Sequence, residues 1–415
     1  MSAPPRAKQV ATQVNGFSAP GFEPVAAALA RAVEQRGEEG CAVSAYVRGR
    51  KVLDLWAGST EGRPWTEDTL ALMFSCTKGA LALCAQVLFD RGLLDLEAPV
   101  ARYWPEFAAS GKEGVLVRHV LTHTAGVVAY PYYWKDLGLD SLRIADWDLM
   151  TGRFAESPAS WPAGSHCFYH ALSIGYLVGE VIRRIDGRSP GRFFAEEVAG
   201  PLGLDMYIGT PDDVLPRVAK IQPEPPRDYD KLTPEQLQLA RLVEQMMATA
   251  RDTVRTGTGI EMEALFWSSN LMHPDLEPVE SYLPTLFNNP VIRRAEIPAG
   301  NAIGGARDLA RMYALLAGGG ELDGVRLVSP GSIARFNTHE ATMMAGLPPI
   351  CVGYHRLGQL FPRASETAFG HGGAGGSLGF ADPERDISFG FVKSRMTNEP
   401  GGAAADLVAA LYECL

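Results

Sequence analysis

The chain has 415 residues, a length typical of two or three structural units. Its 38 basic and 48 acidic side chains give a net charge of −10, which argues against a nucleic-acid-binding protein. Hydrophobic residues make up 46% of the chain, enough for a large core, and no apolar run approaches the roughly 18 residues that a membrane-spanning helix needs. We therefore expect a folded protein with neither a nucleic-acid nor a membrane partner.

The termini and cysteines indicate the compartment. The first residues lack the apolar core of a signal peptide, so we expect a cytoplasmic protein. The six cysteines lie far apart, with no C-x-x-C pair, and are interpreted as free thiols. The sequence implies no metal and no cofactor, and it says nothing about the oligomeric state.

The predicted elements place sheet strands near both ends of the chain and helices between them. In chain order they are a loose polar arm (1 to about 20), a helix (24–35), two strands joined by a Gly-containing turn (41–47 and 52–56), a helix (75–91), a helix (172–185), a helix (308–317), a strand (387–392) and a helix (401–414). We therefore expect both ends of the chain to share one sheet. The segment at about 225–295 has few turn signals in its first half and is interpreted as an inserted helical cover over a site.

The first motif whose residues could carry out a reaction is S-x-x-K at Ser75 and Lys78, where the apolar helix begins. At a spacing of three, the two side chains project from one face of a helix. A serine hydroxyl becomes a good nucleophile when a base removes its proton, and an amine serves as that base when burial keeps it uncharged. Residues 80–88 are almost all apolar, so we expect Lys78 to be buried. The same four letters also occur by chance.

Two further segments add to this motif. Tyr169 follows a Pro/Gly turn and precedes a helix, where a phenol could relay a proton, although a core tyrosine is the simpler interpretation. Residues 370–377 contain five glycines, which let a backbone approach another group closely and offer an N–H to an oxyanion. The alternative for this segment is a flexible turn.

Taken together and in this order, the three motifs resemble those of the serine β-lactamase and penicillin-binding-protein superfamily. The likeness is to its class C-like branch, which includes family VIII carboxylesterases, D-amino-acid amidases and β-lactamase-like acyltransferases. Residues 92–96, 118–126 and 201–204 are similar to connecting signatures of that family. The resemblance spans about residues 24–414, apart from 225–295.

The resemblance implies specific roles for specific residues. Ser75 would be the nucleophile, Lys78 the base and Tyr169 the phenol that shares the proton transfer. The backbone N–H groups of Ser75 and Ala374 would form the oxyanion hole. The expected substrate contacts are His371, Gly372, Gly373, Tyr130 and Trp134.

The chain also departs from the family pattern. The family's Tyr-x-Asn is Tyr-His-Ala at 169–171, so the amide that meets an acyl side chain is missing. The family's Lys-Thr-Gly is His-Gly-Gly at 371–373, which replaces a cation with a mostly neutral imidazole, and Ala374 stands where β-lactamases carry a hydroxyl. These departures favour an esterase or acyltransferase over a β-lactamase.

Other patterns carry less weight. Residues 375–379 match G-x-S-x-G, the nucleophile elbow of α/β-hydrolases, but no histidine follows His371 to complete a triad, so we do not expect Ser377 to react. His119 and His123 are four residues apart, yet they lack the glutamate of a zinc motif. The aromatic residues at 130–134 are equally consistent with an acyl pocket and with a packed cluster.

The fold class expected from the resemblance is α+β: a mostly antiparallel sheet flanked by helices, plus an all-helical domain, as in β-lactamases and transpeptidases. The α/β part would comprise residues 20–75 and 300–415, and the helical part residues 76–299. The favoured function is a serine carboxylesterase that acts on a small-molecule acyl substrate through an acyl-enzyme. The alternatives are an acyltransferase of secondary metabolism, a D-amino-acid amidase or peptidase, and a non-catalytic sensor or scaffold.

Overall fold

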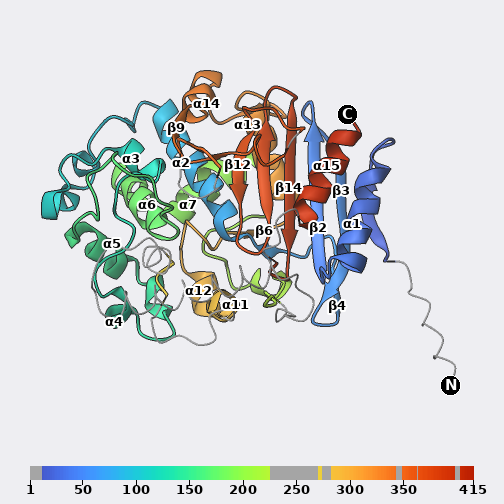
Figure 1. Cartoon of the computed structure of the whole chain (residues 1–415), viewed down its shortest axis with the longest axis horizontal. Coiled ribbons are helices and arrows are strands. Elements are labelled where there is room, and N and C mark those ends of the chain that lie inside the picture. The colour runs from blue at the N-terminus through green and yellow to red at the C-terminus, as the bar shows by residue number, and fades with distance from the viewer. Residues whose placement is uncertain (1–11, 225–269, 273–281, 343–347, 362, 398–401) are drawn as a thin grey trace, which may run out of the picture.

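The computed structural model describes residues 12–224, 270–272, 282–342, 348–361, 363–397 and 402–415. A large antiparallel sheet, flanked by helices, lies beside a region built mainly from helices (Figure 1). This arrangement confirms the α+β class. The division into an α/β part (20–75 and 300–415) and a helical part (76–299) stays a prediction.

The main sheet combines strands from both ends of the chain. Its strands are β1 (Val14–Ser18), β2 (Gly40–Val47), β3 (Arg50–Thr60), β4 (Arg63–Pro64), β9 (His339–Ala341), β10 (Ile350–Cys351), β11 (His355–Arg356), β12 (Phe369–Gly372), β13 (Leu378–Asp382) and β14 (Ile387–Lys393). The order is β1-β3-β2-β14-β13-β12-β11-β10-β9, with β4 paired to β3. Two short pairs lie outside it, β5 (Ala71–Leu72) with β6 (Ile303–Gly304) and β7 (Glu321–Leu322) with β8 (Val325–Arg326).

The centre of the sheet is the pairing of β2 with β14, in which Val43 lies opposite Phe391. This confirms that the two ends share one sheet. The turn between β2 and β3 has positive φ angles at Arg48 and Gly49, as a two-residue hairpin of the favoured twist requires. The N-terminal arm was predicted to be loose, but residues 14–18 pair with β3 along its free edge. The prediction failed because the partner of an edge strand cannot be identified from its own short polar sequence.

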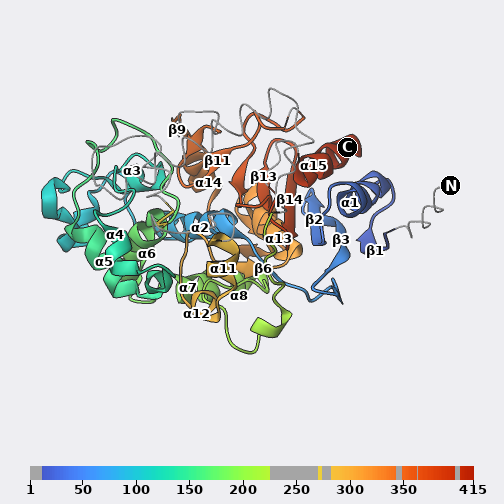
Figure 2. The same cartoon turned by 60° about the horizontal axis from the view of Figure 1, so that its bottom comes forward.

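The helices cover the sheet on both faces and fill the middle of the chain. They are α1 (Glu23–Gln35), α2 (Thr77–Asp90), α3 (Val117–Leu121), α4 (Tyr133–Leu137), α5 (Trp147–Glu156), α6 (Ser173–Asp186), α7 (Pro190–Phe194), α8 (Gly200–Leu202), α11 (Tyr282–Asn288), α12 (Pro290–Arg294), α13 (Ala306–Ala317), α14 (Pro330–Phe336) and α15 (Ala403–Glu413). α1 and α15 pack together on one face, and α13 lies against the other (Figure 2). α13 comes so close that a Cβ on Gly390 of β14 would lie 2.3 Å from the Ala306 carbonyl oxygen.

Helix α2 runs through the core between the sheet and the helical region (Figures 1 and 2). Twelve of its residues are buried, which explains its nearly continuous apolar sequence. Most of the inserted cover expected at 225–295 lies outside the described residues; α11 and α12 occupy its last part. No helix within the described residues has the length and hydropathy to cross a membrane.

Candidate active site

Ser75 lies at the junction of a strand and helix α2. It belongs to a 3₁₀ turn, Phe74–Cys76, that leads directly into the helix. Phe74 has a φ of 47°, a left-handed conformation that is costly for an aromatic residue. This strained bend brings Ser75, which is only half-buried, to the N-terminal end of a helix that is otherwise almost completely buried. Strain of this kind is typical of functional sites.

Lys78 lies one helical turn after Ser75 and points back to it. Its Nζ is 3.0 Å from Ser75 Oγ, and it also donates a hydrogen bond of 2.8 Å to the carbonyl oxygen of Ala299. The side chain is 1% exposed, and this burial lowers the pKa of Lys78 to about 7. A large fraction of the amine is therefore uncharged at neutral pH and able to accept the serine proton.

Tyr169 completes this group. Its hydroxyl hydrogen-bonds to Ser75, and the Lys78 Nζ lies 4.8 Å from the centre of its ring. Burial raises the pKa of Tyr169, so the phenol keeps its proton at neutral pH. The structure thus brings together the three side chains that the sequence motifs singled out.

The glycine-rich segment lies against the same turn. The thiol of Cys76 donates to the carbonyl oxygen of His371 in β12, at 3.1 Å. A Cβ on Gly373 would lie 2.3 Å from the carbonyl oxygen of Met73, so only glycine permits this approach. The N–H of Gly373 donates to Ser377 and closes the turn, whereas that of Ala374 has no acceptor among the described residues. An N–H of this kind can bind an oxyanion.

His371 points away from solvent. Its ring is 1% exposed, its Nε2 lies 3.2 Å from the Gly353 carbonyl oxygen, and its centre lies 4.4 Å from that of His355. Burial lowers the pKa of His371 well below its usual value, so the imidazole is neutral. The site therefore has a neutral ring where the family pattern places a cation, as expected from the sequence.

Three other histidines surround the group, and sequence reasoning assigned none of them to the site. Tyr169 lies 4.8 Å from the ring of His123 and 5.7 Å from that of His355, and His170 lies 5.7 Å from His123. Burial lowers the pKa of each histidine, so all three are neutral at pH 7. No group of three or more His, Cys, Asp or Glu side chains in the described part of the chain is arranged to hold a metal ion. His123 and His170 lie in stretches that the sequence analysis had considered (118–126 and 169–171), whereas nothing in the sequence around His355 indicated that it belongs to the site.

The two predicted aromatic contacts, Tyr130 and Trp134, interact with residues other than Ser75, Lys78 and Tyr169. Tyr130 is 3% exposed, its ring packs edge-on against Phe154 of α5, and its hydroxyl faces the Met150 sulfur. Trp134 packs at the start of α4, with the Lys135 ammonium 5.2 Å from its ring. The interactions of the described residues do not bring either aromatic ring together with Ser75, and their role as substrate contacts stays a prediction.

Ser377 is not in an elbow. It is 3% exposed and lies between β12 and β13, so a strand follows it where an elbow requires a helix. Its carbonyl oxygen is used to close the glycine turn. The geometry agrees with the expectation that this serine has no nucleophilic role.

The chain is similar to known proteins over nearly its whole length. The model of the family described as Beta-lactamase matches residues 25–413. The Esterase/beta-lactamase LipL of Mycobacterium tuberculosis is 32% identical over 396 residues, which cover 92% of this chain and 83% of LipL. The crystal structure of a family VIII carboxylesterase is 31% identical, with a TM-score of 0.80 over 97% of this chain and 100% of the other. EstA from Arthrobacter nitroguajacolicus Rue61a is 27% identical, with a TM-score of 0.77 over 98% of each chain.

Proposed function

We propose that this chain, which belongs to the beta-lactamase family, is a serine hydrolase that cleaves small or medium carboxylic esters through an acyl-enzyme on Ser75. The observation that carries the proposal is the contact of 3.0 Å between Ser75 Oγ and the buried amine of Lys78. The names of LipL and of the carboxylesterase structure support ester substrates.

In the first step, uncharged Lys78 accepts the proton of Ser75, and Oγ attacks the ester carbonyl carbon. The Ala299 carbonyl oxygen holds the Lys78 amine in place through its hydrogen bond, so the lone pair can face the serine. Tyr169, hydrogen-bonded to Ser75, then passes a proton to the leaving alcohol. The phenol fits this role because it keeps its proton until the leaving alkoxide, a stronger base than the phenolate, forms beside it.

Two backbone N–H groups, those of Ser75 and Ala374, receive the negative charge of the tetrahedral intermediate. The close approach of Gly373 to Met73 supports this role, because it holds the turn before Ala374 beside the turn that carries Ser75. Each such donor contributes about 3 kcal/mol to the stability of the transition state. Water then attacks the acyl-enzyme by the reverse sequence of proton transfers.

The departures from the family pattern support an ester substrate over a β-lactam. The His170 ring is buried with its Nδ1 2.6 Å from the Phe168 carbonyl oxygen, so it does not replace the missing asparagine amide. The neutral, buried ring of His371 offers no cation for the carboxylate of a β-lactam. A neutral ester needs neither group.

The proposal is tested with a series of p-nitrophenyl esters of increasing acyl length, combined with mass spectrometry of the trapped enzyme. We expect turnover of the shorter esters and an acyl group on the peptide that contains Ser75. An adduct on any other side chain would overturn the assignment. Ser377→Ala is the matched control and should react like the unchanged protein.

The same assay separates hydrolysis from acyl transfer. When a primary amine competes with water, a hydrolase yields mainly the free acid. An excess of amide would replace the esterase proposal with the acyltransferase alternative, while the role of Ser75 would stand.

A further inference from the structure

One residue of another segment, His123, binds the chain on both sides of Tyr169. The N–H of Phe168 donates to the carbonyl oxygen of His123 at 3.1 Å. On the other side of the tyrosine, the N–H of His170 donates to Nδ1 of the His123 ring at 3.0 Å. The backbone and the side chain of one histidine therefore bind the residues immediately before and after Tyr169.

The ring of His123 also contacts the tyrosine itself. The two ring centres are 4.8 Å apart with an angle of 42° between the planes. The histidine is 2% exposed, and burial lowers its pKa well below the usual value. Because Nδ1 accepts a hydrogen bond, the ring proton of the neutral form must be on Nε2.

The backbone of His123 is strained in a way that these contacts explain. Its φ is 59°, in the left-handed region that histidine enters more often than most residues but that few side chains adopt. The neighbouring Thr124 also accepts the N–H of Gly164, so the contact extends along the loop. Strain maintained at one buried position beside Ser75, Lys78 and Tyr169 indicates a functional constraint.

We propose that His123 is a positioning residue that clamps Tyr169 against Ser75 and Lys78. The inference rests on the proposed catalytic role of these three residues. His123 is given no part in the proton transfer itself, because its one unprotonated ring nitrogen, Nδ1, already accepts the N–H of His170. Its effect is instead on where the phenol lies, and displacements of about 1 Å in an active site can lower rates by roughly a hundred-fold.

His119 offers a matched control. It is also a buried histidine whose Nδ1 accepts a backbone N–H, but the donor is Leu116, at the start of its own helix α3. It is 7% exposed, and burial lowers its pKa as well. Loss of His119 therefore reproduces the loss of a buried histidine without releasing the neighbours of Tyr169.

The experiment compares His123→Gly, His123→Asn and His119→Asn with the unchanged protein on one alkyl ester, whose leaving group depends on the proton from Tyr169. Glycine keeps the left-handed backbone but removes the Nδ1 acceptor, and we expect kcat to fall about 10- to 100-fold with little change in KM. Asparagine tolerates the same backbone and offers an amide oxygen as acceptor, so it should restore part of kcat. His119→Asn should lower the melting temperature and leave kcat within about two-fold.

A double-mutant cycle with Tyr169→Phe tests whether His123 acts through the tyrosine. We expect the double variant to be no slower than Tyr169→Phe alone. Fully additive losses, or an equal fall in kcat for His119→Asn, would overturn the inference. A Tyr169→Phe variant with normal kcat would instead contradict the proposed function, so the two failures can be told apart.

A measurement on the unchanged protein does not depend on whether the variants fold. Long-range ¹H–¹⁵N spectra of its histidine rings report which nitrogen carries the proton. We expect His123 to be the neutral Nε2–H tautomer across pH 6–8. A proton on Nδ1 would exclude the hydrogen bond from His170 and with it the clamp.

Discussion

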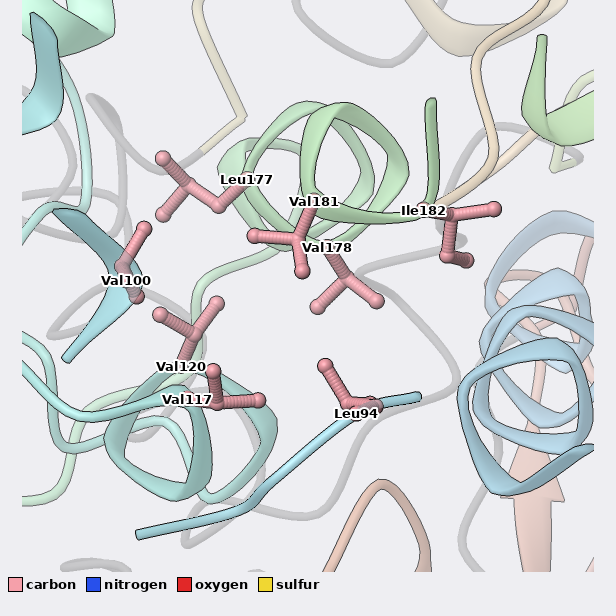
Figure 3. Close-up of a pocket in the computed structure, with 8 residues that line it drawn as sticks. All are labelled: Leu94, Val100, Val117, Val120, Leu177, Val178, Val181 and Ile182. Atoms are coloured by element: carbon pink, nitrogen blue, oxygen red, sulfur yellow. The ribbon is translucent and has the colours of Figure 1, made fainter. Parts of the chain in front are cut away.

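Two buried regions of this molecule differ in what lines them. Between α3 and α6 lies a small pocket surrounded by aliphatic side chains only (Figure 3). They are Leu94, Val100, Val117, Val120, Leu177, Val178, Val181 and Ile182. At the start of α2, by contrast, burial surrounds an amine, a phenol and several imidazoles.

The difference shows that burial has opposite consequences for the two kinds of side chain. Removing aliphatic groups from water stabilises the fold and gives no reactivity. Removing the Lys78 amine from water destabilises the fold, because the charged form loses its hydration, and the same loss turns the amine into a base. Substitutions in the aliphatic pocket should therefore lower stability and leave activity unchanged, whereas substitutions at the start of α2 should lower activity.

The largest effect is expected for Ser75→Ala. Without the nucleophile, the acyl-enzyme cannot form, and kcat should fall by roughly 10⁴-fold or more. Steady-state rates on a p-nitrophenyl ester, with melting temperatures to confirm folding, measure this. Activity close to that of the unchanged protein would mean that the nucleophile lies elsewhere.

Lys78→Met should abolish turnover and raise stability. In the unchanged protein, kcat/KM should rise as the pH passes about 7, because only the deprotonated amine is a base.

The pKa of Lys78 is lower in the folded protein than its value of 10.5 in the unfolded chain, so the unfolded state binds more protons between pH 7 and 10. The stability of the unchanged protein should therefore approach that of the methionine variant as the pH rises through this range.

Two observations check this prediction. Lys78→Arg should also be inactive, since a guanidinium stays charged. Denaturant unfolding of the methionine variant and the unchanged protein at several pH values gives the stability difference. A difference that widens from pH 7 to 10 would contradict the lowered pKa.

Tyr169→Phe should reduce kcat by about 10²- to 10⁴-fold, the usual contribution of a group that transfers a proton. The ring remains, so its packing beside His123 and His355 should persist and the melting temperature should change little. Esters with a better leaving group need less help from an acid. The loss should therefore be smaller for p-nitrophenyl esters than for alkyl esters, and equal losses would argue against proton donation to the leaving group.

The aliphatic pocket should show the reverse behaviour. Leu177 is completely buried, and Leu177→Ala enlarges the pocket, which should cost about 3 kcal/mol of the free energy of unfolding. The kcat of the folded variant should be unchanged. Leu139→Ala, at a site 56% exposed, is the control and should alter stability by less than about 0.5 kcal/mol.

The sequence predicted the parts of the site that depend on local geometry. The spacing of Ser75 and Lys78 along one helix determines their contact, and the apolar residues after them indicate burial. The contact of Tyr169 with this pair follows from the family resemblance and not from spacing. The elements of the sheet near both ends were predicted because period-two patterns and turn residues are local signals.

Other features depend on long-range packing and left no local signal. Phe74 and His123 both have a positive φ, and nothing in the residues beside them in the sequence predicts it. His355 reaches the site only because β11 pairs with β12. Tyr130 and Trp134 illustrate the opposite problem, since an aromatic cluster has the same sequence pattern whether it lines a site or packs in a core.

The pairing of β2 with β14 has a consequence for biosynthesis. During translation the β2–β3 hairpin leaves the ribosome long before β14 is made, so the face that β14 later helps to bury stays exposed to solvent until then. Ser75 and α2 are also made early, whereas the glycine-rich turn that packs against them is made late. Non-local pairing of this kind slows folding, and nascent chains should rely on chaperones until the final strands are released.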